Sequence, residues 1–249
     1  MKFIIKTSLV TLLLLSLNSC VKDEPKSPHS CTAPLTIEFS SAIATEPLEL
    51  QNTLYSDYLG RNYKVELLKF YLSNWALEKE NGELISIDQI NLLDFSLEEM
   101  QKLETEIDTG TYVSLHFSVG LDSLTNSSDP ADFENTHPLS ISQNTYWTWA
   151  SKYKFFMLEG RIDTTGEEVP NQIFSYHTGD NASYREISIP LNNLYLDSTG
   201  DSLNLQLDLD KLINGDFGTI DFVSTPNSHS LDEISEKISN NLVSSFSIY

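Results

Sequence analysis

Cysteine is scarce in this chain, which has only Cys20 and Cys31 among its 249 residues. Two cysteines, one of them assigned to lipidation below, leave a single thiol that has no partner within the chain. This excludes a disulfide-stapled fold and every paired Cys-x-x-Cys metal or redox motif. Cys31 lies in a segment rich in serine and proline, where we expect a tether and not a metal ligand.

Basic residues are also few, since 15 Lys and Arg stand against 36 Asp and Glu, for a formal net charge of −21. A field of that sign repels phosphate, so nucleic acid and bare anionic lipid are poor partners. The acidity itself names no ligand and predicts a well-solvated exterior.

Common catalytic motifs are missing. The chain has no Gly-rich phosphate loop, no Gly-x-Ser-x-Gly elbow and no His-Glu-x-x-His motif. Carboxylates are so abundant that a pair of them near a cleft would be no evidence for a catalytic acid and base. We therefore expect a binding protein and not an enzyme.

No hydrophobic run in the sequence is long enough to span a bilayer. The apolar run from Leu9 to Leu17 is too short to do so. It follows Lys2 and Lys6 and ends in Leu17-Asn18-Ser19-Cys20, the bacterial lipoprotein pattern. This predicts a signal peptide over residues 1–19, acylation of Cys20, which anchors the protein in the membrane, and a tether over residues 20–34.

The charged residues behind Cys20 indicate where the lipoprotein is displayed. Val21-Lys22-Asp23-Glu24 resembles the export signal of surface lipoproteins in the Bacteroidota. We expect an outer-membrane lipoprotein exposed on the cell surface, the alternative being a periplasm-facing anchor.

Residues 35–249 show the periodicity of a single all-β domain. Residues 35–39 alternate apolar and polar side chains, and residues 71–77 would place Tyr71, Ser73, Trp75 and Leu77 on one face. Asn81-Gly82 is a strong hairpin signal. About ten short strands with frequent turns predict an antiparallel β-sandwich.

Two helices are expected beside the strands. Ser96-Leu97-Glu98-Glu99 forms a capping box with Leu97, Met100 and Leu103 at helical spacing behind it. Ser230-Leu231-Asp232-Glu233 forms a second box, followed by an apolar stripe at residues 234, 238 and 242. These patterns predict a short connecting helix and a C-terminal helix.

Histidine is the most informative residue type because there are only five. His29 lies in the tether and His116 on the wetter face of a strand, whereas His137, His177 and His229 lie at strand ends, loops or a helix entrance. Loop-end histidines can converge at one end of a sandwich, and neutral imidazoles suit copper or zinc. The alternative is that each is an ordinary surface or turn residue.

Two of the three tryptophans stand close together. The segment from Tyr146 to Gly160 is expected to be one central strand, with Trp147 and Trp149 on the same face. They could pack in the core, form an aromatic platform for a ligand such as a sugar, or belong to a soft-metal site with the histidines.

An ordered set of motifs resembles the MbnP-like family, copper-binding proteins encoded beside methanobactin operons and their lipoprotein relatives. The resemblance covers nearly all of the mature chain. The motifs are Phe70 to Asn74, Phe117 to Asp122, His137-Pro138-Leu139, Tyr146-Trp147-Thr148-Trp149, Tyr153 to Gly160, Phe174 to Gly179, and Asn240-Asn241 to Phe246.

The resemblance implies a β-sandwich that binds copper through histidines, in some members with a tryptophan oxidised to kynurenine by a di-haem partner of the cytochrome c peroxidase type. It implies His137, His177 and His229 as ligands and Trp147 or Trp149 as the modified residue. The rival hypothesis is a surface module without metal that binds glycan or protein on an aromatic platform.

Overall fold

A computed structural model of the chain describes residues 31–97, 101–147 and 152–249. The expected signal peptide, the acylation of Cys20 and Trp149 lie outside these residues. The first strand begins at Thr32, so residues 32–34 of the expected tether belong to the folded unit. No helix among the described residues is long and apolar enough to cross a membrane.

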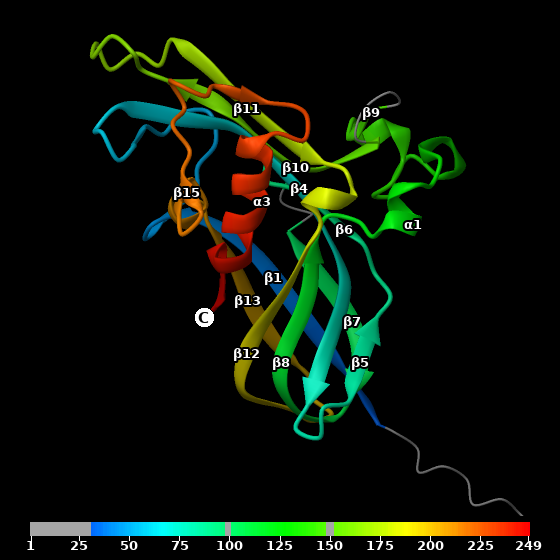
Figure 1. Ribbon diagram of the computed structural model, residues 1–249. Helices are drawn as coiled ribbons and strands as arrows, with labels where there is room; N and C mark the ends of the chain where they lie inside the picture. The colour runs from blue at the N-terminus through cyan, green and yellow to red at the C-terminus, as the bar shows by residue number, and fades with distance from the viewer. Residues whose placement is uncertain (1–30, 98–100, 148–151) are drawn as a thin grey trace, which may run out of the picture. The chain divides into compact units, whose positions relative to one another are not determined.

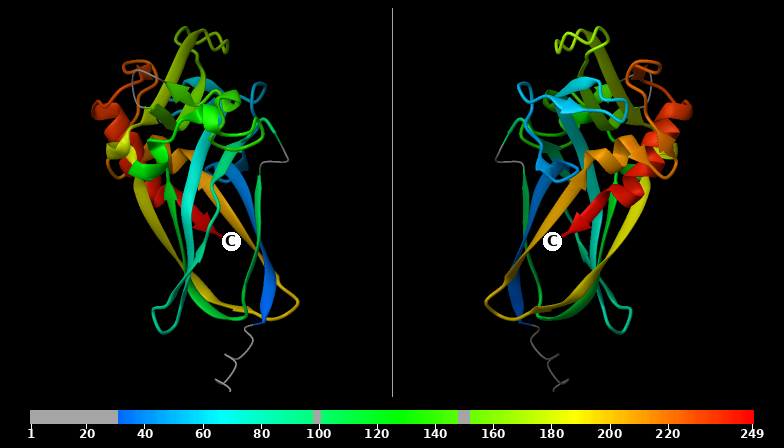
Figure 2. Two further views of the ribbon diagram at one scale, coloured as in Figure 1. Left: turned by 90° about the vertical axis from the view of Figure 1, so that its right-hand side faces the viewer. Right: turned by 90° about the vertical axis from the view of Figure 1, so that its left-hand side faces the viewer.

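Two β-sheets face each other across one hydrophobic core (Figure 1). The smaller sheet has five strands, in the order β17 (Phe246–Ile248), β13 (Asp201–Asp208), β1 (Thr32–Ile43) and β2 (Glu46–Pro47), with β7 (Lys102–Asp108) also paired to β1. Figure 2 shows its blue and gold strands facing the cyan, green and yellow strands of the larger sheet. The predicted all-β sandwich is confirmed.

The larger sheet has ten strands and carries the candidate site. Its main path is β12 (Arg185–Leu196), β8 (Gly110–Val119), β4 (Asn62–Lys79), β10 (Lys152–Ile162), β11 (Gln172–Gly179) and β16 (Asn227–Ser228). Beside this path β3 (Tyr55–Ser56), β5 (Leu84–Ile87) and β6 (Asn91–Asp94) pair with β4, and β9 (Tyr146–Trp147) pairs with β10. A separate two-stranded ribbon joins β14 (Asn214–Gly215) to β15 (Gly218–Thr219).

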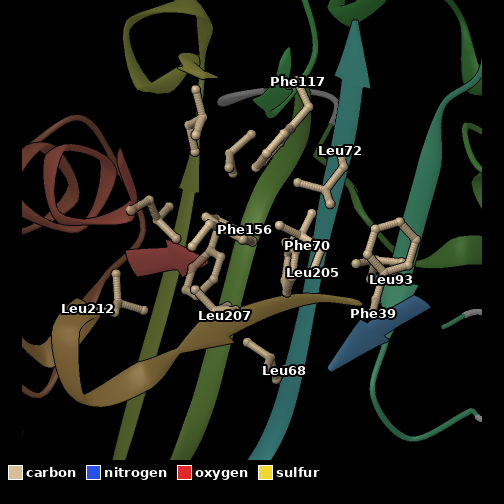
Figure 3. Packing of buried hydrophobic residues seen from close by; sticks show 14 of the residues in the cluster. Phe39, Leu68, Phe70, Leu72, Leu93, Phe117, Phe156, Leu205, Leu207 and Leu212 are labelled. Carbon is tan, nitrogen blue, oxygen red and sulfur yellow. The ribbon is translucent and has the colours of Figure 1, made fainter. Parts of the chain in front are cut away.

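The core is built from the inward faces of both sheets. Figure 3 shows Phe70, Leu72 and Phe156 of the larger sheet meeting Leu205 and Leu207 of the smaller one. All five are fully buried or nearly so. Burial of such side chains contributes about 1.5–3 kcal/mol each, which makes this core the main source of stability.

The predicted antiparallel pairing holds for most strands but not all. β1 runs parallel to β13, with Leu35 opposite Asp201 and Ala42 opposite Asp208. Parallel neighbours require a long connection, and every strand of the larger sheet except β16 lies between these two strands in sequence. A local hairpin signal could not have revealed this pairing. The hairpin at Asn81-Gly82 is confirmed, with β5 antiparallel to β4.

The expectation that Tyr71, Ser73, Trp75 and Leu77 share one face is wrong. The β4–β8 register shifts between Ser73 and Ala76, and Asn74 adopts a left-handed conformation with φ of 52°. The extra residue of this bulge reverses the facing of the strand. Trp75 and Leu77 therefore join the sandwich core, whereas Tyr71 packs against Tyr153 in a smaller cluster on the opposite face.

Among the described residues the helices are α1 (Ser123–Asn126), α2 (Leu209–Ile213) and α3 (Glu233–Ser245), with 3-10 turns η2 (Pro130–Asp132), η3 (Ile141–Gln143) and η4 (Asn181–Ser183). The connecting helix expected at residues 97–103 does not extend to Leu103, which lies in β7, and residues 98–100 are outside the described chain. Leu103 and Ile107 alternate with acids and bury against the core, so strand period prevails over helical spacing.

The C-terminal helix α3 is present, and its N-cap is Asp232, two residues later than the expected Ser230. The Asp232 carboxylate accepts from the Ser235 amide at 2.8 Å and from the Ser228 hydroxyl at 2.7 Å. A carboxylate bonds the free amides of a first turn well, which moves the start of the helix to Asp232. Leu231 is consequently left outside the helix and exposed.

Candidate metal centre

Strands β10 and β11 present an outward face that carries the candidate site. Glu159 of β10 lies directly opposite Ser175 of β11, and Met157 lies opposite His177. Opposed residues and those two positions away share a face, so Glu159, Ser175 and His177 all point away from the core. Their neighbours Leu158 and Tyr176 point inward and are buried.

Glu159 binds the imidazole of His177 directly. The His177 Nε2 to Glu159 Oε1 distance is 2.6 Å, and the side chain of His177 is only 8% exposed. The pKa of His177 is lowered to about 4, chiefly because burial penalises the charged imidazolium; Glu159 opposes this shift, and His229 and Lys154 reinforce it. His177 is therefore neutral at pH 7 and holds a free lone pair for a metal.

His229 reaches the same face from the far side of β11. The short strand β16 runs parallel to β11, with Asn227 opposite Ser175, and the chain passes directly from it to His229. Nε2 of His229 donates to the Ser175 carbonyl at 3.1 Å. The ring centroids of His229 and His177 lie 4.6 Å apart.

The other ring nitrogen of His177 is the one available to a ligand. Its Nδ1 is buried and has no hydrogen-bond partner. A buried, unpaired acceptor is costly, and sites of this kind call for an explanation such as an ion. Metal–imidazole bonds are about 2 Å long, so two nitrogens that share one ion lie at most about 4 Å apart, which rings with this separation can satisfy.

Trp147 completes the cluster, though not as the sequence predicted. It lies in β9, which folds back on β10 with Trp147 opposite Lys152, so the segment from Tyr146 to Gly160 is two strands and not one. The indole ring centre lies 5.6 Å from that of His177 and 5.7 Å from that of His229. Trp147 is half-buried, and the expectation that it shares a strand face with Trp149 concerns a residue outside the described part of the chain.

Lys154 covers the indole of Trp147. Its ammonium group lies 4.8 Å from the ring centre, and the side chain is buried. The register between β10 and β11 shifts between Lys154 and Phe156, a bulge that places Lys154 opposite Gly179 and on the same face as His177. Desolvation lowers the pKa of Lys154, with the nearby Lys69 adding to the shift and Glu159 opposing it.

His137 makes its contacts within its own loop. Its ring stacks on Phe133 at 4.4 Å, and its Nδ1 accepts from the Leu139 amide at 3.1 Å. In the described part of the chain, no hydrogen bond or ring contact joins it to His177 or His229. The structure thus brings two of the three expected histidines together, with Trp147 as the adjoining tryptophan.

The other histidine on a strand, His116, behaves as expected for a wetter face. It is half-buried, and its Nε2 lies 2.9 Å from Glu78 Oε2. It borders an open cleft of about 780 Å³ on the faces of β4, β8 and β12, lined also by Asn74, Ser118 and Glu186.

Sequence reasoning missed Glu159 and Lys154. Glu159 is one of 36 acidic residues, and only its register opposite Ser175 distinguishes it. Lys154 could have been noted as a lysine within a strongly apolar strand, where an unpaired charge is unusual. Within the described residues, no three or more His, Cys, Asp or Glu side chains are arranged to hold a metal. The candidate site is a pair of imidazoles, one of which is bound by Glu159.

Comparisons with known proteins agree with this architecture. The family model for MbnP matches residues 32–231. Among solved structures, MbnP from Methylosinus trichosporium is similar with a TM-score of 0.54 and 17% sequence identity, over 74% of this chain and 78% of that chain. At this identity the likeness demonstrates a shared fold. A comparison with curated proteins gives no match.

Proposed function

This chain belongs to the MbnP family, whose role is in copper handling, and from that premise we propose that it binds copper as cargo through His177 and His229. The ring separation of 4.6 Å and the neutral state of His177 support this pair. Imidazole nitrogens are ligands that copper favours strongly over the harder metals.

One observation carries the proposal, the buried Nδ1 of His177 that has no partner. The large majority of buried side-chain polar atoms have a hydrogen-bond partner, and an exception within a pair of imidazoles is accounted for by a bound ion. Copper at this position would satisfy Nδ1 while Glu159 continues to hold Nε2.

We propose Trp147 as the residue that a di-haem partner would oxidise to kynurenine. Its ring centre lies 5.6 Å from that of His177 and 5.7 Å from that of His229, and among the tryptophans of the described residues it is the one beside this pair. Kynurenine carries an aromatic amine and a ketone, so the change would add donor atoms where indole has only an N–H.

The lipoprotein assignment extends the proposal to the cell envelope. Acylation of Cys20 would anchor the protein in the outer membrane, with the copper-binding unit displayed on the cell surface. We expect the wild-type protein to incorporate labelled palmitate and the Cys20→Ala variant not to. Digestion of the protein by protease added to intact cells would distinguish surface display from a periplasmic orientation.

The test combines intact mass with copper titration of the protein purified from its native envelope. We expect one copper per chain, a large loss of affinity in His177→Ala and His229→Ala, and unchanged affinity in the matched control His116→Ala, whose imidazole is held by Glu78. Unchanged affinity in His177→Ala would remove that residue from the site. An unmodified chain that binds glycan but no copper would favour the aromatic platform instead.

A further inference from the structure

Both histidines of the pair are held through the same ring nitrogen. His177 Nε2 lies 2.6 Å from Glu159 Oε1, and His229 Nε2 lies 3.1 Å from the Ser175 carbonyl oxygen. A carbonyl oxygen and an ionised carboxylate only accept hydrogen bonds. Each Nε2 must therefore carry the proton, which leaves the lone pair of each neutral ring on Nδ1.

The two acceptors have a common origin in the sheet. Glu159 and Ser175 are directly opposed in the antiparallel pair β10–β11. One register thus supplies the carboxylate for His177 from one strand and the backbone carbonyl for His229 from the other. A slip of one residue would turn the Glu159 side chain to the opposite face and remove it from His177.

Glu159 is suited to hold a ring without occupying the metal position. Its side chain is 37% exposed, while that of His177 is 8% exposed, so the carboxylate reaches the ring from the solvent side and leaves Nδ1 enclosed. Carboxylates in this relation to a histidine orient the ring and increase its basicity.

We propose that Glu159 is a positioning residue that commits His177 to bind copper through Nδ1, and that the Ser175 carbonyl does the same for His229. The proposal rests on the proposed function, because it assigns the binding atoms of the same pair. It predicts a site in which both imidazoles bind through Nδ1.

The first test is the tautomer of the metal-free protein, read from long-range ¹H–¹⁵N correlation spectra of the imidazoles at pH 7. We expect the Nε2–H tautomer for His177 and His229. Addition of Cu(I), which is diamagnetic, should then shift the Nδ1 resonances of both rings and leave Nε2 protonated. An Nδ1–H tautomer in either ring, or a shift confined to Nε2, would overturn the assignment.

The second test removes the carboxylate. Glu159→Leu should lower copper affinity about 10–100-fold and produce a mixture of His177 tautomers. Glu159→Gln keeps an acceptor oxygen and should restore both the tautomer and most of the affinity. The control Glu78→Leu, which releases His116 in the same way, should change neither copper affinity nor the spectrum of His177.

The outcomes separate this inference from the proposed function. Copper binding with wild-type affinity and an unchanged tautomer in Glu159→Leu would refute the positioning role while leaving the copper site intact. Wild-type protein that binds no copper would refute the site itself, and the metal-free tautomer would still report whether Glu159 and Ser175 orient the rings. Should Glu159→Leu not fold, the wild-type spectra and Glu159→Gln decide the question.

Discussion

The ammonium group of Lys154 lies 4.8 Å from the ring centre of Trp147, on the same sheet face as His177. A cation over an indole is favourable, more so when both are shielded from water. This arrangement also sets a buried positive charge beside the proposed copper ligands. Its repulsion contributes to the low pKa of His177.

Replacement of Lys154 by Met should strengthen copper binding. The change removes a like charge close to the bound cation while keeping the length of the side chain, and we expect affinity to rise several-fold, equivalent to about 1 kcal/mol. Lys152→Met is the matched control, because Lys152 is exposed and donates to Ser127. Competition titrations with a copper chelator measure the copper affinity of both variants and of the wild type. A Lys154→Met variant with the same affinity as Lys152→Met would contradict the electrostatic role of Lys154.

Stability should fall between about pH 6.5 and pH 4 because of His177. Its pKa is about 4 in the folded protein, against about 6.5 when unfolded, so only the unfolded chain takes up the proton in this window. The contribution lost on acidification is on the order of 3 kcal/mol, and none of it is lost above pH 6.5. Urea unfolding across this range should show a shallower pH dependence for His177→Gln than for the wild type. Parallel curves would show that His177 titrates normally.

His137→Ala should retain copper affinity within a few-fold. The ring stacks on Phe133 and accepts from the Leu139 amide, so its loss should weaken the loop by about 1 kcal/mol without touching the His177–His229 pair. Thermal unfolding and copper titration of the same sample separate the two effects. A loss of affinity as large as that of His177→Ala would make His137 a third ligand.

Tryptophan emission should report copper through Trp147. Its indole is 5.6 Å from the His177 ring, whereas Trp75 is buried in the core between Phe39 and Phe117. In unmodified protein, Trp147→Phe should abolish most of the quenching caused by Cu(II). Trp75→Phe should lower stability and preserve the quenching, and the reverse pattern would place copper elsewhere.

Gly160→Ala should destabilise the protein by about 1–3 kcal/mol. A methyl group there would collide with the Lys64 carbonyl oxygen of the adjacent strand β4 and with the ring of Phe174. Gly166→Asn is the control, since Gly166 has open space and a positive φ that Asn tolerates. Denaturant midpoints compare the two, and equal losses would mean that β4 can shift to accommodate the methyl group.

Local pattern was sufficient for much of the fold. Period-two alternation located long strands such as β1 and β4, Asn81-Gly82 located a hairpin, and the apolar stripe through Ile238 and Leu242 located α3. Residue type alone also selected His177 and His229, because few histidines were available and imidazole is a good ligand for soft metals. These signals depend only on residues close together in the chain, which is why the sequence by itself determined them.

Tertiary structure decided which residues meet. The parallel pairing of β1 with β13 joins segments that are separated in sequence by every strand of the larger sheet except β16. The bulges at Asn74 and beside Lys154 change which face the following residues occupy, and this depends on the partner strand. Glu159 has no local signature, yet its register opposite Ser175 brings it to His177. A one-residue change in register exchanges the two faces of a strand, so the site could be assembled only once the pairing of β10 and β11 was known.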